Sequence, residues 1–547
     1  MRRYFSVLMV ELLVAATLVS PFGARAQTTA TGQGTTTPIA HIVVIFDENI
    51  SFDHYFGTYP VAANPEGEPA FIPLPNTPAV NGLAGALLSN NPTLNPANGT
   101  AAVNPYRLDR SQAATSDQNH SYGPEQLALH NGLVDLYPVS TGVAGNTPST
   151  STGAATGTVA MNMGYYDGNT VTGLWNYAQK YAMSDNSFDT EFGPSTPGAL
   201  NLVSGQLDGA INNTNGTGAL TSDGAGGMAD IGDADPAGDM CSTTSGETFS
   251  MSGTNIGDLL NNDGISWGFF TQGFDLTVTN ANGTTGCARN TKSFVTDTLK
   301  ADYIPHHEPF QYYKSTANLT HARPGSVAAI GKTDAANHQY DVHDFFDAIK
   351  AGNYPAVSFL KAPGYQDGHA GYSDPLDEQA WIVGVINFLQ QSSGDWAHTL
   401  VVIAYDDSDG WYDHAMPPIV NQSTSPADML SGTGQCGSSG ANTALPGVDG
   451  VAHAQGRCGY GIRMPLMAIS PYSKSNYVDH TLTDQTSIIR FIEDNWLNSE
   501  RIGSGSFDGI ANSIANMLDF ARPLALGDYI LNPTSGEVVK TLREVPR

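Results

Sequence analysis

Two continuous runs of apolar residues stand out along the chain, and acidic residues follow each of them directly. Residues 40–46 (AHIVVIF) precede the acidic pair at 47–48, and residues 399–405 (TLVVIAY) precede the acidic pair at 406–407. Short apolar runs without alternation are typical of parallel strands that are buried on both faces of a sheet. We therefore expect two buried strands whose carboxyl ends carry polar side chains.

Helical periodicity marks two further segments, residues 376–390 and residues 486–497. In both, apolar side chains recur at the three- and four-residue spacing of one helix face. These apolar positions are Ile382, Val385, Ile386, Leu389, Ile488, Ile489, Ile492 and Trp496. The alternation of strand and helix predicts an α/β fold in which a mainly parallel sheet is covered by helices.

Long polar stretches interrupt this pattern. Residues 61–115, 138–159, 206–254 and 421–456 are rich in Gly, Asn, Thr, Ser and Pro. We interpret them as surface insertions within one domain that spans residues 27–547, rather than as linkers between domains.

Charge narrows the range of partners. The chain has 547 residues, of which 23 are basic and 52 acidic, so its formal net charge is −29. The hydrophobic share of 40% is too high for a disordered chain. The acidic balance disfavours nucleic acid and anionic membranes as partners, because both repel a negative protein at long range. An anionic substrate must therefore meet a local positive charge.

The first 26 residues have the pattern of an export signal. Arg2 and Arg3 precede a mostly apolar run, and residues 24–26 (ARA) offer small side chains for a signal peptidase that would cut before Gln27. A buried or membrane-anchoring helix is the alternative, which the shortness of the run disfavours. We expect a periplasmic or extracellular protein without stable membrane insertion. The export route and the oligomeric state stay open.

Four cysteines agree with an oxidising destination, and none has the C-x-x-C spacing of a zinc or redox site. They are Cys241, Cys287, Cys436 and Cys458. Three pairings are open, and two pairs of free buried thiols are the alternative to any disulfide. We favour Cys241 with Cys287 and Cys436 with Cys458, because each disulfide would close a polar excursion that otherwise lacks a core.

The polar residues at the two strand ends suggest a metal site. Asp47, Glu48 and Asn49 follow one run, and Asp406 and Asp407 follow the other, so oxygen ligands distant in sequence can meet at one edge of a sheet. Such oxygens suit one divalent cation, Mg²⁺, Ca²⁺ or Mn²⁺, with Zn²⁺ and Fe²⁺ not excluded. Asp and Asn after a strand are also ordinary turn formers, so each pair alone is weak evidence.

Several histidines and one serine lie in loop-like contexts rather than on helix faces. The histidines are His120, His307, His369 and His414. Most loop histidines only complete hydrogen bonds, but several beside a metal site would suit the handling of phosphate and protons. Ser195 lies between two prolines and is followed by Gly198, which is either a plain turn or a rigidly presented hydroxyl. No G-x-S-x-G motif contains it, so the main motif of an α/β-hydrolase is missing.

These segments together resemble a known family. Residues 41–57 (HIVVIFDENISFDHYFG) resemble the opening signature of the bacterial phosphoesterase family that contains phosphatidylcholine-type phospholipases C and secreted acid phosphatases. The resemblance runs from about His41 to Trp496. Further blocks follow in the family's order at residues 117–121, 131–132, 163–166, 193–195, 307–310, 354–358, 405–407, 411–414, 463–465 and 469–471.

The resemblance implies roles for particular residues. It implies a nucleophilic Ser195 that touches a divalent metal and passes through a phosphoserine intermediate. It also implies a fold similar to the alkaline-phosphatase superfamily, with helices on both faces of a mainly parallel sheet. The implied metal ligands are Glu48, Asn49, Ser195, Asp406 and Asp407, and the implied catalytic and substrate-binding histidines are His120, His307 and His369.

Departures from the family pattern bear on the substrate. Phospholipase C members typically carry Thr at the nucleophile position, then Pro-Asn-Arg, whereas this chain has Ser195 and then Pro-Gly-Ala at 197–199. Asp407 replaces their usual Glu, and only 51 residues follow Trp496 (547 − 496). We therefore expect a secreted acid phosphatase of broad specificity rather than a phospholipase C that cleaves phosphatidylcholine-type lipids. A non-catalytic secreted binding protein on a phosphatase fold is the alternative from another functional class.

Overall fold

The computed structural model describes residues 34–142, 160–214, 218–430, 435–437, 448, 455–525 and 527–541. The expected export signal at residues 1–26 and parts of the expected insertions at 138–159 and 421–456 lie outside these residues. Gly34–Arg547 forms one compact unit.

An eight-stranded sheet forms the centre of this unit, with β1 (His41–Asp47) near its middle. β1 pairs in parallel with β15 (Val357–Lys361) on one side and with β16 (Thr399–Tyr405) on the other. The remaining strands are β11 (Trp267–Thr271), β14 (Gln339–Tyr340), β17 (Leu466–Ile469), β4 (Ala182–Ser184) and β18 (Tyr477–Asp479), in the order β14-β11-β15-β1-β16-β17-β4-β18.

The sheet is mainly parallel, as the sequence predicts. In its described part, β17 alone runs opposite to its neighbours, pairing antiparallel with β16 and with β4. The two strands predicted from apolar runs are the adjacent central strands β1 and β16, and β1 is shifted by one residue relative to the predicted 40–46. Both are almost completely buried, which explains why their sequences lack polar alternation.

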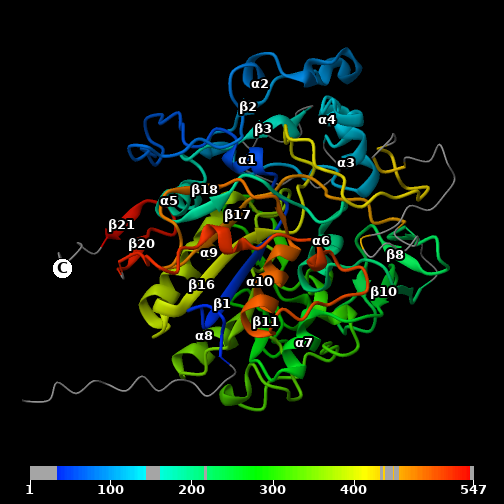
Figure 1. The fold of residues 1–547 in the computed structure, drawn as a ribbon, viewed down its shortest axis with the longest axis vertical. Helices are drawn as coiled ribbons and strands as arrows, with labels where there is room; N and C mark the ends of the chain where they lie inside the picture. The colour runs from blue at the N-terminus through cyan, green and yellow to red at the C-terminus, as the bar shows by residue number, and fades with distance from the viewer. Residues whose placement is uncertain are drawn as a thin grey trace, which may run out of the picture. The chain divides into compact units, whose positions relative to one another are not determined.

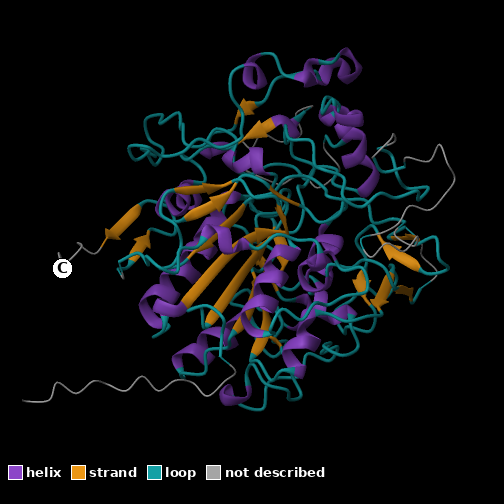
Figure 2. Cartoon of the chain, in the orientation of Figure 1, coloured by secondary structure: helices purple, strands orange, loops and turns teal. Residues whose placement is uncertain are grey.

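Helices cover both faces of the sheet, as Figures 1 and 2 show. Val43 and Ile45 of β1 point into one hydrophobic cluster, whereas Ile42, Val44 and Phe46 point into the other. This alternation follows from the pleat of a strand that is buried on both faces. The first cluster holds side chains of α5 (Thr172–Lys180), α8 (Val342–Lys350) and α9 (Pro375–Ser392), and the second those of α6 (Ser195–Ser204), α7 (Ile256–Asn262) and α10 (Thr486–Trp496).

The two helices predicted from periodicity are α9 and α10. Asp374 begins α9, since its carboxylate accepts hydrogen bonds from the backbone N–H groups of Leu376 and Asp377, and Pro375 occupies the first helical position, where no N–H is needed. The predicted α/β fold with a central sheet between helices is therefore confirmed.

The described parts of the polar insertions contain small sheets of their own. Residues 206–254 hold β6 (Ala210–Asn212), β9 (Asp235–Pro236) and β10 (Thr248–Met251) in one sheet, and β7 (Leu220–Ser222) with β8 (Met228–Asp230) in another. The other elements are α1 (Phe52–Phe56), α2 (Ala86–Ser89), α3 (Tyr122–Leu129), α4 (Tyr137–Ser140), β2 (Tyr106–Arg107), β3 (Gly164–Tyr165), β5 (Ser187–Phe188), β12 (Asn290–Lys292), β13 (Leu299–Ala301), β19 (Thr483–Asp484), β20 (Tyr529–Leu531) and β21 (Val538–Thr541).

Two disulfides link the four cysteines. Cys241 pairs with Cys287 and Cys436 pairs with Cys458, with Cα atoms 5.2 and 5.6 Å apart. This is the pairing that the sequence analysis favours. Within the described residues, no helix combines the length and the apolar character that crossing a membrane requires.

Asp341 joins α8 to the segments that lead out of β11. Its carboxylate begins α8 by accepting from His343 N, and it also accepts from Gly273 N and Asp275 N at 3.1 and 3.0 Å. Arg289 donates to it at 3.2 Å. Burial acts to raise the pKa of Asp341, but these donors and the His343 side chain outweigh burial and lower the pKa to about 2.

We predict that Asp341→Asn lowers the free energy of unfolding by about 2 kcal/mol at pH 7. A carboxylate whose pKa is depressed in the folded state stabilises above its unfolded pKa of about 4, and this contribution is lost as pH falls toward 2. Urea denaturation should therefore show a smaller difference from wild type at pH 3. Asp347→Asn, at an exposed position of the same helix, should change stability by less than about 0.5 kcal/mol. A pH-independent deficit in the Asp341 variant would contradict the charge argument.

Candidate active site

The carboxyl ends of the central strands bring the predicted ligand residues together. Glu48 and Asn49 directly follow β1, while Asp406 and Asp407 directly follow β16. Because β1 and β16 are parallel neighbours with Asp47 opposite Tyr405, the two groups lie side by side. Asn49 N donates to Asp406 Oδ1 at 2.8 Å, which joins the two loops directly.

Ser195 is the first residue of α6, and its hydroxyl points at these loops. Its Oγ lies 3.0 Å from Glu48 Oε2, 3.2 Å from Asp407 Oδ2 and 3.4 Å from Asn49 Oδ1. The side chains of all four residues are buried. Asp406 completes the group through backbone N–H groups, since its Oδ1 accepts from both Asn49 and Asp407. The structure thus places three predicted ligands around the hydroxyl of a fourth, Ser195, and joins the fifth, Asp406, to them through backbone hydrogen bonds.

A glycine in the first turn of α6 permits this close approach. A Cβ atom at Gly198 would lie 2.1 Å from the carbonyl oxygen of Asp406, closer than any real contact. Helix and strand end therefore meet backbone to backbone, which no larger residue allows without displacement. Asp233, from the insertion at 206–254, holds the same turn, because Thr196 N donates to its Oδ1 at 2.9 Å.

The buried carboxylates of the site fit a divalent cation. Burial raises the pKa of Glu48 and of Asp407, and the negative charge of Asp406 raises both further. Among the described residues, Asp406 Oδ2 is buried without a hydrogen-bond partner. Several buried carboxylates so close together are costly unless a positive charge compensates them. Carboxylate, amide and hydroxyl oxygens are the donors that hard divalent cations take.

One compensating charge comes from the protein itself. Lys361, the last residue of β15, forms a buried ion pair with Glu48 Oε1. His307 Nδ1 lies 3.1 Å from the same oxygen, Glu48 Oε1. Burial and the positive charges of neighbouring groups hold the pKa of His307 well below its usual range.

The other two predicted histidines lie on the Asp407 side of the site. His120 Nδ1 is 3.3 Å from Asp409 Oδ1, and Asp409 N donates to Asp407 Oδ1 at 2.6 Å. The ring of His369 meets that of His120 edge-on, with centroids 5.9 Å apart. Burial acts to lower the pKa of His120, but the carboxylates of Asp407 and Asp409 outweigh it and raise the pKa well above its ordinary value.

These histidines belong to a second group of potential metal ligands. One ligand atom from each of four residues lies within 4.8 Å of the others, and the four are Asp117, His120, His369 and Asp409. Asp409 Oδ1 also accepts from Asn49 Nδ2 at 3.0 Å, so the two groups form one continuous polar site.

His414, also noted in the sequence, lies elsewhere. Its Nδ1 is 2.6 Å from Asp53 Oδ2, in a buried network where Arg463 pairs with Asp53 and Asp413 at 3.1 Å. Arginine already neutralises these carboxylates, so the network has a structural explanation without a metal.

Sequence reasoning missed Lys361, Asp409 and Asp117 as members of the site. Lys361 had a usable signal, because it ends an apolar stretch (VSFLK) just as the acidic residues end theirs. Asp409 stands two residues beyond the predicted ligand Asp407, inside the same polar run. Asp117 opens the block at residues 117–121 that resembles the family, but its segment contains no regular strand or helix that would place it at the site.

Comparison with known proteins decides the family. The sequence profile of the phosphoesterase family matches residues 39–497, which is most of the chain. The chain belongs to the phosphoesterase family. This confirms the resemblance that the motifs indicate.

Several phosphoesterase relatives are phospholipases C by name. A non-hemolytic phospholipase C from Burkholderia pseudomallei is 26% identical over 84% of this chain and 55% of its own length. A non-hemolytic phospholipase C from Pseudomonas aeruginosa is 23% identical over 89% of this chain and 58% of its own length. Phospholipase C A from Mycobacterium tuberculosis is 22% identical over 90% and 79%. The chain thus spans little more than half the length of the first two.

Among solved structures, murine ectonucleotide pyrophosphatase/phosphodiesterase 5 is similar over 64% of this chain and 95% of its own, with 12% identity and a TM-score of 0.28. At this TM-score the similarity adds nothing to the description of the fold, which comes from the sheet and helices of this phosphoesterase alone.

We predict that Gly198→Ala reduces hydrolysis of a chromogenic phosphate ester by at least about 100-fold, because the added methyl group pushes Ser195 away from the carboxylates. Steady-state kinetics and circular dichroism on the same preparation check this. The matched control is Gly384→Ala on an exposed face of α9, where a Cβ atom meets nothing within 4 Å. The control should keep full activity and gain slightly in stability. Equal activity in both variants would contradict the close-packing argument.

Proposed function

We propose that this phosphoesterase is a metal-dependent phosphoric ester hydrolase that acts through Ser195. The observation that carries the proposal is the position of Ser195 Oγ, 3.0 to 3.4 Å from oxygens of Glu48, Asp407 and Asn49 at the start of a helix. A serine that served only as a helix cap would accept from the backbone of its own helix, and Ser195 does not occupy that position.

The chemistry follows from the positions of these groups. A divalent cation, when bound to the carboxylate and amide oxygens, would withdraw charge from phosphate oxygens and favour loss of the serine proton. Ser195 Oγ passes its proton to a neighbouring carboxylate oxygen and attacks phosphorus as the bond to the leaving oxygen breaks, and a histidine protonates the departing alcohol. Water then attacks the phosphoserine from the vacated side and gives its proton to the same histidine. Inorganic phosphate leaves as Ser195 Oγ takes its proton back from the carboxyl group.

The buried surroundings of Ser195 support this sequence of events. The Ser195 hydroxyl lies within hydrogen-bond distance of one oxygen of Glu48 and one of Asp407, which holds the Oγ atom at a fixed position beside the two carboxylates. His307 lies beside Glu48, His120 is linked to Asp407 through Asp409, and His369 contacts His120. The three imidazoles are the groups that we propose for phosphate binding and for protonation of the leaving group. Such preorganised groups in a dry site supply most of the stabilisation that phosphoryl transfer needs.

We propose phosphomonoesters of broad structure as the substrates. Serine rather than threonine at position 195, Gly198 in the following turn and Asp407 in the ligand set support an acid phosphatase. A phospholipase C is the second candidate, favoured by the names of relatives that are 22 to 26% identical. The gathering of Ser195 with its acidic neighbours argues against a non-catalytic binding protein, because burying that set has no structural benefit.

We further propose that the protein works outside the cytoplasm, in the periplasm or the medium. The leader-like pattern at residues 1–26 supports this location, and so do the two disulfides, which persist in oxidising compartments.

Ser195→Ala should abolish turnover of both p-nitrophenyl phosphate and p-nitrophenylphosphorylcholine, since it removes the attacking oxygen, while the fold is retained. Assays with and without added divalent metal measure this. Ser204→Ala, at the other end of α6, removes a hydroxyl that bonds Leu200 O and Tyr313, so it should lose about 1 kcal/mol of stability but keep activity. Full activity in the Ser195 variant would refute the nucleophile assignment.

Asp407→Asn should lower metal content and activity together, because a charged oxygen ligand is lost. Elemental analysis of the purified protein and kinetics at saturating metal measure the two effects, and we expect each to fall at least 10-fold. The control is Asp508→Asn, a buried acid that accepts from Ile502 N outside the site. An Asp407 variant with unchanged metal content would show that the ligand set is wrong.

A further inference from the structure

The hairpin of β12 and β13 carries a lysine toward the site. In this hairpin Thr291 pairs with Lys300, and Lys292 pairs with Leu299. Successive residues of a strand point to opposite faces, so Leu299 faces outward, with 60% of its surface exposed, while Lys300 faces inward. No sequence motif had marked Lys300.

The Lys300 side chain joins the active site through a stack of rings. Its Nζ lies 3.6 Å from the centre of the Tyr372 ring. Tyr372 stacks on His369 with centroids 4.2 Å apart, and His369 in turn meets His120. A cation over a tyrosine ring is favourable, and the ring gives the ammonium group a fixed position beside the predicted phosphate-binding histidines.

Lys300 differs from Lys361 in having no carboxylate partner. Lys361 is paired with Glu48, whereas no described carboxylate lies within the 4.0 Å ion-pair distance of Lys300 Nζ. Burial lowers the pKa of Lys300, and the charges of Asp367, Glu48, Asp117 and Asp233 act in the opposite direction from longer range. Lys300 therefore lies among several carboxylates without forming a direct ion pair with any described one.

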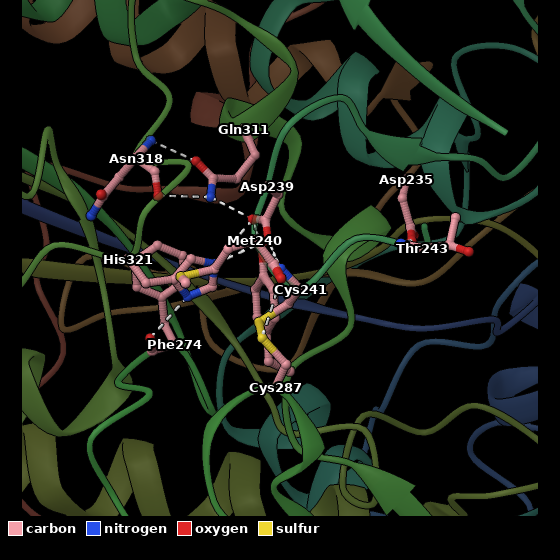
Figure 3. The surroundings of a disulfide bond; sticks show 11 residues. Asp235, Asp239, Met240, Cys241, Thr243, Phe274, Cys287, Gln311, Asn318 and His321 are labelled. Carbon is pink, nitrogen blue, oxygen red and sulfur yellow. Dashed lines mark hydrogen bonds and ion pairs between the residues drawn. A yellow bond between two sulfur atoms is a disulfide. The ribbon is translucent and has the colours of Figure 1, made fainter. Parts of the chain in front are cut away.

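The hairpin that presents Lys300 is tied down at its base. Cys287 lies three positions before the first residue of β12 and is bonded to Cys241 of the 206–254 insertion, as Figure 3 shows. Arg289 then pairs with Asp302 and Asp341 at 3.1 and 3.2 Å.

Two further contacts hold the body of the hairpin. At the turn, Ser293 Oγ donates to Asp377 at 2.8 Å. Beside β13, a Cβ at Gly364 would lie 2.8 Å from Lys300 Cγ, so the lysine stem is packed against the backbone. Contacts at both ends of the hairpin therefore fix the position of Lys300.

We propose that Lys300 makes the site selective for phosphomonoester dianions over phosphocholine-type diesters. This rests on the proposed function of the site. A monoester carries a charge of about −1.5 to −2 at pH 7, whereas a diester carries one negative charge. An unpaired ammonium binds the additional negative charge, and it repels the quaternary ammonium of a choline headgroup. In a protein of net charge −29, such a local positive group is what allows a dianion to remain bound.

The kinetic test compares Lys300→Met with wild type on p-nitrophenyl phosphate and p-nitrophenylphosphorylcholine. We expect kcat/KM for the monoester to fall about 10- to 100-fold, the effect of losing one charged hydrogen bond. For the choline ester kcat/KM should change by less than about 3-fold, because the lost attraction for its phosphate is offset by the relieved repulsion of its choline group. Lys300→Arg should restore monoester activity in large part. The matched control is Lys292→Met, an exposed lysine of the same hairpin paired with Asp297, which should leave both activities unchanged. Equal losses on both substrates, or no loss on the monoester, would overturn the proposal.

A binding measurement decides the proposal independently of turnover. Titration calorimetry of metal-loaded protein with inorganic phosphate should show at least about 10-fold weaker binding in Lys300→Met than in wild type or Lys292→Met. If wild type hydrolyses neither ester, the proposed function fails, and this comparison still tests Lys300 as an anion-binding group. Unchanged phosphate affinity in the Lys300 variant would overturn the proposal even in an active enzyme.

Discussion

The register between β1 and β16 is the constraint on which the site depends. Seven consecutive residue pairs, from His41 with Thr399 to Asp47 with Tyr405, hold the two strands in parallel. Both strands therefore end at the same level, and the residues after each are forced into one small volume. A slip of one residue would turn Glu48 or Asp406 toward the opposite face of the sheet. The hydrophobic clusters on both faces oppose such a slip, because each strand is apolar on both sides.

This geometry brings several acidic side chains together in a buried part of the protein. Burial raises the pKa of Glu48 and Asp407, yet strand, helix and backbone hydrogen bonds hold these carboxyl groups close together. Lys361 offsets only part of their charge. A cation bound to these oxygens would relieve the repulsion among their charges. The oxygens that are costly to bury are therefore the same ones that would bind it.

The parts of the fold that sequence alone predicts are those with long, uniform patterns. β1 and β16 are mostly apolar runs of 7 residues each, and α9 and α10 show helical periodicity over 18 and 11 residues. The polar residues that follow the two strands lie where these runs place them. Short strands such as β4 and β18, with three residues each, have too few positions to show a period. The antiparallel direction of β17 is likewise invisible in a buried strand of four residues.

The residues of the candidate site also fall into those that the sequence predicts and those that it does not. Residues next to long strands were predictable as neighbours, whereas Asp233 and Lys300 come from segments whose composition indicates only loops. Their positions depend on tertiary contacts and on a disulfide, neither of which leaves a periodic trace in the sequence. The roles of the site residues remain predictions, and the structure supplies the distances on which those roles rest.

The Cys241–Cys287 bond joins two segments that lie 46 positions apart in the sequence. One is the 206–254 insertion, whose Asp233 accepts from the first turn of α6, and the other leads into the hairpin that carries Lys300. A single covalent link therefore couples the segment that supports the proposed nucleophile to the segment that supplies the proposed anion-binding lysine.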